Sequence, residues 1–252
     1  MPKKIAHLVL IFVFSFLFCL SSAKNYAESP DDDTKKLYEV QALYQQGKID
    51  ESLKLVSALI ERHPNLPDLY FIRASIYREM SENEKALPDI EKVLAATPAD
   101  VNAIKLKASI CLDIGEYKTA VRECTKFLSL SNDDAGIYNV RGLAYFYQGE
   151  YKKAVSDFSK QINAGDGTAA VYRNRALAYY GMQKYEESLA DFTSSIELDP
   201  SDVMTIKNRG AVYLQLKHPK EALADLNKAL EFSTGESERA EIQALIQKVK
   251  GL

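Results

Sequence analysis

Apolar residues recur along most of this chain at the spacing of amphipathic helices. Between residues 135 and 168, Tyr138, Gly142 and Tyr145 stand at positions i, i+4 and i+7, and Gly149 ends the run. A second run at helical spacing follows at once: Tyr151, Ala154, Phe158 and Ile162. The pattern predicts two helices joined by a short turn.

This helix pair repeats every 34 residues. Residues 34 apart share their character, as in a series that contains only small side chains: Ser52, Ala86, Ala120, Ala154, Ser188 and Ala222. Counted from Asp33, six units follow one another without insertion or deletion: 33–66, 67–100, 101–134, 135–168, 169–202 and 203–236. A repeat of this length predicts an all-α fold in which each helix pair packs on the next.

The fourth unit carries a family resemblance. Its residues 138–145 (Tyr-Asn-Val-Arg-Gly-Leu-Ala-Tyr) and 149–154 (Gly-Glu-Tyr-Lys-Lys-Ala) resemble a tetratricopeptide repeat, and the resemblance covers about 33–236. It implies a right-handed superhelical α-solenoid whose first helices line a concave, peptide-binding groove. The sequence departs from the family at the position that usually holds Trp: Lys36, Tyr70, Ile104, Tyr138, Tyr172 and Ile206.

The resemblance also implies which side chains face the groove. By analogy they include Phe71, Arg78, Lys105, Asn139, Phe146, Tyr147, Arg173, Asn174, Tyr180, Lys207 and Asn208. Asparagine offers both a donor and an acceptor to an extended peptide, and Arg and Tyr are common at interface hot spots. The alternative is that these are ordinary solvated helix residues. No three consecutive units carry the Lys and Asn set with which chaperone-binding relatives hold a terminal carboxylate, so chaperone tails are not the expected ligand.

Two positions of the repeat carry opposite charges. Position 7 holds Arg73, Lys107, Arg141, Arg175 and Arg209, and position 23 holds Asp89, Glu123, Asp157, Asp191 and Asp225. In the first unit both charges change together, to Glu39 and Leu55. Because these positions nearly face each other in an antiparallel helix pair, we predict a structural ion-pair ladder. Breaking one pair should cost about 1–4 kcal/mol. The alternative is a row of cations that binds an anionic ligand.

The N-terminus has the form of a secretory signal peptide over residues 1–23. Two lysines precede an apolar run from Ile5 to Leu20, and Ser21-Ser22-Ala23 supplies small residues at the cleavage site. The expected protein is therefore exported, periplasmic or secreted, with a polar linker over 24–32. The alternative is an uncleaved membrane anchor over residues 5–20, although this run is shorter than the roughly 20 residues that span a bilayer. Phe18 before Cys19 argues against lipidation of that cysteine.

The C-terminal segment, 237–252, predicts one more helix. Ile242, Leu245, Ile246 and Val249 share one helical face, which suits a capping helix over the last unit. Its mixed charges argue against the alternative of membrane binding.

Composition and motifs offer little chemistry. With 32 basic and 35 acidic residues, the formal charge of −3 gives no electrostatic attraction to nucleic acid. His63 and His218 lack metal-ligand spacing, and no catalytic motif is present. Cys111 and Cys124 are expected as buried core residues rather than as a redox pair. We therefore expect no enzyme, no cofactor, no metal and no small-molecule substrate.

The sequence as a whole predicts a non-enzymatic scaffold or adaptor of the cell envelope or secretory compartment. Its partner would be a protein or peptide held in the groove, with no nucleic acid, and with a membrane only if the N-terminal segment is uncleaved. The alternatives are a membrane-anchored assembly factor and a non-catalytic subunit of an envelope enzyme complex.

Overall fold

The structure, a computed structural model, describes residues 32–131 and 134–251. The predicted signal peptide and residues 24–31 of the predicted linker lie outside the described residues. Helices and turns make up the described chain, which contains no strand. The chain divides into two compact units, an N-terminal unit that ends at Glu116 and a C-terminal unit that begins at Tyr117.

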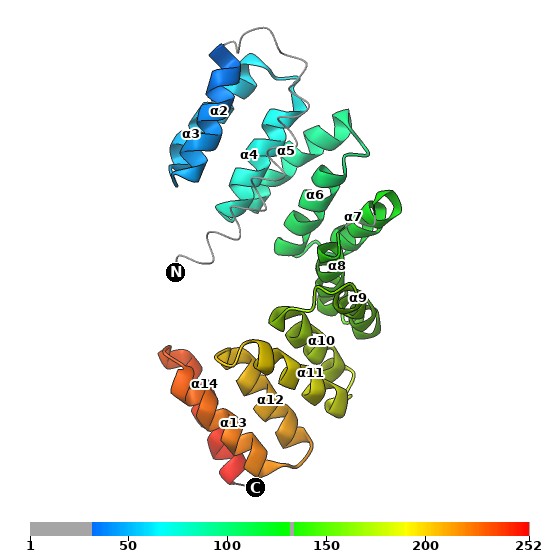
Figure 1. Cartoon of the computed structure of the whole chain (residues 1–252), viewed down its shortest axis with the longest axis vertical. Helices are drawn as coiled ribbons and strands as arrows, with labels where there is room; N and C mark the ends of the chain where they lie inside the picture. The colour runs from blue at the N-terminus through cyan, green and yellow to red at the C-terminus, as the bar shows by residue number, and fades with distance from the viewer. Residues whose placement is uncertain (1–31, 132–133, 252) are drawn as a thin grey trace. The chain divides into compact units, whose positions relative to one another are not determined.

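The N-terminal unit is a run of antiparallel helices that pack in chain order (Figure 1). Its helices are α2 (Asp32–Gln45), α3 (Ile49–Arg62), α4 (Pro67–Glu79), α5 (Asn83–Ala96) and α6 (Val101–Asp113). Val56, Ile72, Ile76 and Ile90 are buried together between these helices and form a single apolar core.

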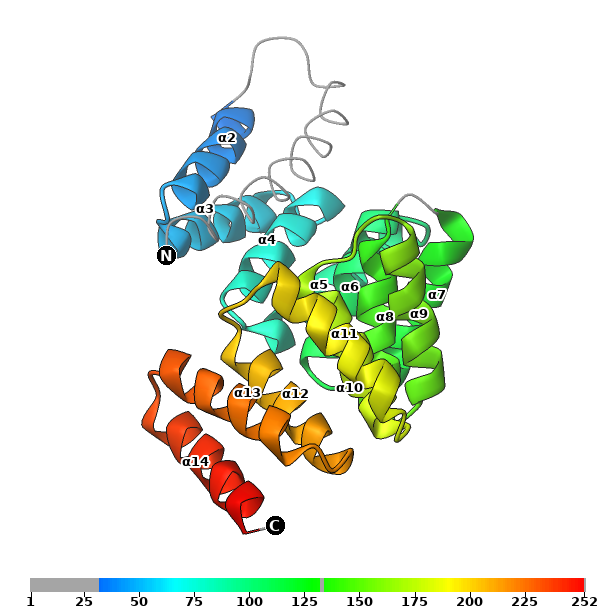
Figure 2. The ribbon, with the colours of Figure 1, turned by 60° about the horizontal axis from the view of Figure 1, so that its bottom comes forward.

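The C-terminal unit continues the same pattern (Figures 1 and 2). Its helices are α7 (Tyr117–Leu130), α8 (Gly136–Tyr147), α9 (Tyr151–Asn163), α10 (Ala169–Gly181), α11 (Tyr185–Leu198), α12 (Val203–Gln215), α13 (Pro219–Phe232) and α14 (Glu236–Lys250). Figure 2 shows α14 lying along α13, where Ile242 and Ile246 are buried against Leu226 and Ala229. The predicted all-α array of helix pairs with a C-terminal capping helix is confirmed.

Each helix pair turns at the same backbone conformation. Position 15 has a positive φ in every repeat: Gly47 (76°), Ser81 (60°), Gly115 (82°), Gly149 (75°), Gln183 (60°) and Lys217 (61°). At Gly149 the turn closes when the Glu150 amide donates to the Tyr145 carbonyl at 2.9 Å. Glycine adopts this left-handed conformation without strain, so three of the six turns hold a residue that is less suited to them.

Small side chains let the two helices of a pair approach closely. A Cβ added to Gly142 on α8 would lie 2.7 Å from Cε1 of Phe158 on α9, which is too close for two carbon atoms. Where the small residue of the second helix is a serine, it is also satisfied, since the Ser188 hydroxyl donates to the Ala176 carbonyl at 2.8 Å. The packing therefore depends on a small residue opposite a large one.

Within the described residues, none of the helices is both long enough and apolar enough to span a bilayer.

Candidate binding faces of the first helices

Arginine residues fix the first helix of most pairs in place. On α8, Arg141 donates from Nε and Nη2 to the Asp157 carboxylate of α9 at 2.7 and 2.9 Å. Its Nη1 donates to Thr125 Oγ1 of α7 at 3.2 Å. One planar guanidinium therefore links three helices, and the bond to Asp157 raises the pKa of Arg141 above its ordinary value.

The same arrangement recurs in both units. Arg175 bonds Asp191 and Ser159, and Arg209 bonds Asp225 and Thr193. In the N-terminal unit, Arg73 bonds Asp89 and reaches Ser57 at 3.5 Å. The structure thus forms four of the five pairs expected from positions 7 and 23, and it adds a hydroxyl partner at position 25.

The predicted pair of Lys107 and Glu123 would join the two compact units and stays a prediction, and each residue has another partner within its own unit. Lys107 Nζ donates to Glu91 at 3.0 Å, and Glu123 accepts from Arg122 at 2.9 Å. Glu91 occupies position 25, where four of the other five repeats have a hydroxyl, so a carboxylate of the preceding helix attracts the cation. An ammonium also lacks the planar fork with which arginine spans two partners.

In the N-terminal unit, the predicted groove residues have mainly structural neighbours. Phe71 is half-buried and packs against the apolar core. Arg78 of α4 donates from Nε to Asp113 of α6 at 3.3 Å, so it links neighbouring first helices. Lys105 is half-buried on α6.

In the C-terminal unit, two asparagines meet on neighbouring first helices. Asn174 Nδ2 of α10 donates to Asn139 Oδ1 of α8 at 3.3 Å. The Asn139 amino group and the Asn174 carbonyl take no part in this bond, and they are one donor group and one acceptor. Asn208 stands at the equivalent position on α12 and is likewise half-buried.

The two predicted basic groove residues of this unit are held by carboxylates. Lys207 of α12 donates to Glu241 of α14 at 2.9 Å, and Arg173 of α10 donates to Asp202 at 2.6 Å. Asp202 also caps α12, where its carboxylate accepts from the Met204 amide. Burial is the largest single influence on Asp202, but hydrogen bonds from Thr205 and Arg173 together outweigh it and lower its pKa.

Aromatic rings border this face at the turn end of the helices. Tyr147, 57% exposed, stacks on Tyr117 with ring centroids 5.1 Å apart. Phe146 packs on Tyr151 and Tyr180 on Tyr185, at 5.5 and 5.6 Å. The second ring of each contact, Tyr117, Tyr151 or Tyr185, was not among the predicted groove residues. Its signal was present, because position 17 of three consecutive repeats is tyrosine: Tyr117, Tyr151 and Tyr185.

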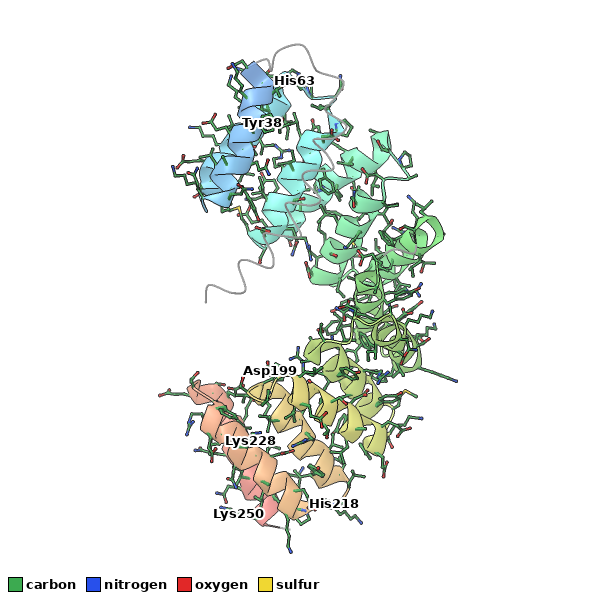
Figure 3. The ribbon with its side chains drawn as sticks, viewed as in Figure 1. Tyr38, His63, Asp199, His218, Lys228 and Lys250 are labelled. Atoms are coloured by element: carbon green, nitrogen blue, oxygen red, sulfur yellow. The ribbon has the colours of Figure 1, made fainter. Side chains whose placement is uncertain are left out.

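The remaining candidates for chemistry are the histidines and cysteines. Figure 3 shows His63 at the end of α3, where its ring bonds Asp33 at 2.7 Å, and His218 at the turn before α13. Cys111 and Cys124 are both buried. Across the described ranges, no group of three or more His, Cys, Asp or Glu side chains is placed to hold a metal ion.

Comparison with known proteins agrees with this architecture. Family models described as tetratricopeptide repeat match residues 38–101, 135–164, 169–202 and 208–234, together more than half of the chain. The fold and its repeating ion pairs define a helical repeat protein built from stacked hairpins. The chain belongs to the tetratricopeptide repeat family.

Solved structures share the fold. A tetratricopeptide repeat protein from Parabacteroides merdae is 20% identical over 98% of each chain, with a TM-score of 0.63. YrrB, described as a TPR protein with an unusual peptide-binding site, is 18% identical over 78% of this chain and 98% of its own, with a TM-score of 0.62. A chain of the APC/C complex Cut9–Hcn1 is 17% identical over 91% of this chain and 45% of that one, at 0.70. No curated protein matches the sequence.

Proposed function

We propose that this protein is a non-enzymatic scaffold or adaptor that holds a peptide or a segment of a partner protein against α8, α10 and α12. The observation that carries the proposal is the Asn139–Asn174 pair, which presents a donor and an acceptor from neighbouring first helices. An extended peptide has unpaired backbone amides and carbonyls that match these groups.

The surroundings of the asparagine pair support this use. Arg173 and Lys207 are held by Asp202 and Glu241, so the neighbouring helices are ordered before a ligand arrives, and little side-chain entropy remains to be lost. The exposed ring of Tyr147 adds an apolar surface at one end. The peptide-binding site named for YrrB is consistent with a peptide ligand here.

We place this scaffold in the cell envelope or secretory compartment. The support is the basic head, the apolar run and the small residues of positions 1–23. N-terminal sequencing of the purified protein tests this location: a chain that starts at Lys24 supports export with cleavage, and a chain that retains residues 5–20 supports the membrane-anchored alternative.

Photo-crosslinking tests the binding face. A photoreactive residue at Tyr147 should capture a discrete partner from cells that express the protein, and the same residue at Ala190 on the outside of α11 should not. The variant Asn139→Ala/Asn174→Ala should lose that partner, while Asn227→Ala on the exposed side of α13 should keep it. Equal capture by the Asn139→Ala/Asn174→Ala variant would place the binding site elsewhere.

A further inference from the structure

The outer faces of α7 and α9, the second helices of two successive pairs, carry charge of one sign. All exposed charged residues of these two helices are basic: Lys118, Arg122, Lys126, Lys152, Lys153 and Lys160. Their acidic residues, Glu123 and Asp157, are buried beneath this surface. We call the six exposed side chains the outer basic face.

The two basic rows come near each other at Arg141. The guanidinium of Arg141 on α8 bonds both Thr125 of α7 and Asp157 of α9, so these parts of the two helices lie within reach of one side chain. Lys160 stands 3.7 Å from Asp157 and 5.3 Å from the centre of the Tyr138 ring, directly beside this link. Basic residues at i, i+4 and i+8 on α7 extend the face over about 12 Å.

Ion pairs neutralise part of the outer basic face, since Arg122, Lys153 and Lys160 each pair with a carboxylate. Lys153 pairs with Glu150 at 3.2 Å, but both side chains are more than half exposed, and such pairs contribute little. Arg122 bonds Glu123 and keeps 67% of its side chain exposed. Lys118 and Lys152 occupy the same position of successive repeats and are both exposed.

The next second helix has the opposite charge. The exposed charged residues of α11 are all acidic: Glu186, Glu187 and Glu197. Arg175 of α10 bonds Ser159 of α9 and Asp191 of α11, so α11 is the second helix that follows the outer basic face across one linking side chain. The positive surface therefore ends at α11. A long nucleic acid or a membrane plane laid across α7 and α9 would meet these glutamates, whereas a short acidic segment would not.

We propose that the outer basic face binds a short acidic segment of a partner protein. It lies on second helices and is separate from the peptide-binding face proposed for α8, α10 and α12. The protein then holds two partners at once, one on the first helices and one on the second helices. Charge complementarity selects the acidic partner and accelerates its encounter.

Binding of a fluorescein-labelled polyglutamate peptide to the full chain, followed by fluorescence anisotropy at low salt, tests the proposal. The variant Lys118→Gln/Lys152→Gln should bind about tenfold more weakly. The matched control Lys54→Gln/Lys220→Gln loses the same charge from exposed positions of α3 and α13 and should bind within about twofold of the unmodified chain. Glu186→Lys extends the basic face and should bind more tightly, and added NaCl should weaken all binding.

Two further measurements separate this proposal from others. Thermal unfolding of each variant checks that the fold is kept. The variant Asn139→Ala/Asn174→Ala should bind polyglutamate as tightly as the unmodified chain, whether or not the peptide-binding face proposed for α8, α10 and α12 exists. The proposal is overturned if both lysine variants weaken binding equally. It is also overturned if single-stranded DNA or phosphatidylglycerol vesicles bind more tightly than polyglutamate, or if sedimentation shows self-association that Lys118→Gln/Lys152→Gln abolishes, since the acidic partner would then be a second copy.

Discussion

The third and fourth repeats occupy identical frames of 34 residues, yet their ion pairs differ. In the fourth, Arg141 reaches forward to Asp157 and back to Thr125. In the third, Lys107 reaches back to Glu91. The difference teaches that a charge ladder depends on three positions rather than two. A hydroxyl at position 25 of the preceding repeat, such as Thr125, adds a bond to the cation, whereas a carboxylate there, such as Glu91, forms an ion pair with it.

The largest expected effect comes from breaking the link that Arg141 makes with Asp157 and Thr125. Asp157→Asn removes the carboxylate that accepts two bonds from Arg141 and is 2% exposed, and it leaves the partly buried guanidinium without its counter-charge. We expect a loss of about 3 kcal/mol in the free energy of unfolding, measured by urea denaturation. In the third repeat, Glu123→Gln should cost less than about 1 kcal/mol, because its partner Arg122 is mostly in water. Equal losses in the two repeats would contradict the comparison.

A second test concerns helix approach. The fourth repeat places Gly142 against Phe158, whereas the third places Ala108 and Cys124 at the same positions. Gly142→Ala should destabilise by about 1.5 kcal/mol, because overpacking outweighs the gain in helix propensity. Adding Phe158→Leu to Gly142→Ala should recover part of this loss in a thermal melt. A stabilised Gly142→Ala variant would mean that Phe158 moves aside freely.

A third test uses a feature that both repeats share. Gly115 and Gly149 have φ values of 82° and 75°, so alanine at either position should cost about 1 kcal/mol, and nearly the same at both. Gln183 has φ 60° in the equivalent turn, and Gln183→Gly should therefore stabilise by a few tenths of a kcal/mol. Chemical denaturation of the three variants checks these signs, and destabilisation by Gln183→Gly would argue against strain in that turn.

The smallest expected effect is a pH dependence of stability, and it comes from the Arg173–Asp202 pair that links α10 to the start of α12. The pKa of Asp202 lies below its ordinary value of 3.8 in the folded chain, so the unfolded chain binds the proton more readily. The contribution of ionised Asp202 to the free energy of unfolding is present above about pH 4 and is lost as the pH falls through the folded-state pKa. Because the pair is partly exposed, we expect less than about 0.5 kcal/mol. Arg173→Gln should reduce the difference in stability between about pH 6 and pH 3, and an unchanged difference would exclude this pair as its source.

Periodicity was sufficient to predict the helix pairs, their turns and the C-terminal cap, because 34-residue spacing with small and large positions allows few other packings. Periodicity was not sufficient to predict every partner in the charge ladder. Positions 7 and 23 predict Arg73, Arg141, Arg175 and Arg209 correctly, but Lys107 depends on Glu91 in the preceding helix. The partners of Arg173 and Lys207 were also missed, because Asp202 and Glu241 lie 29 and 34 residues away and meet them only after the repeats stack.

The sequence by itself determined the repeat, the turns and the side of each helix that is buried, since these follow from local spacing and side-chain size. Only the tertiary structure decided which charges meet. Side chains from different repeats converge through packing, so a carboxylate remote in sequence can capture a cation, and the basic rows of α7 and α9 can come near each other at Arg141.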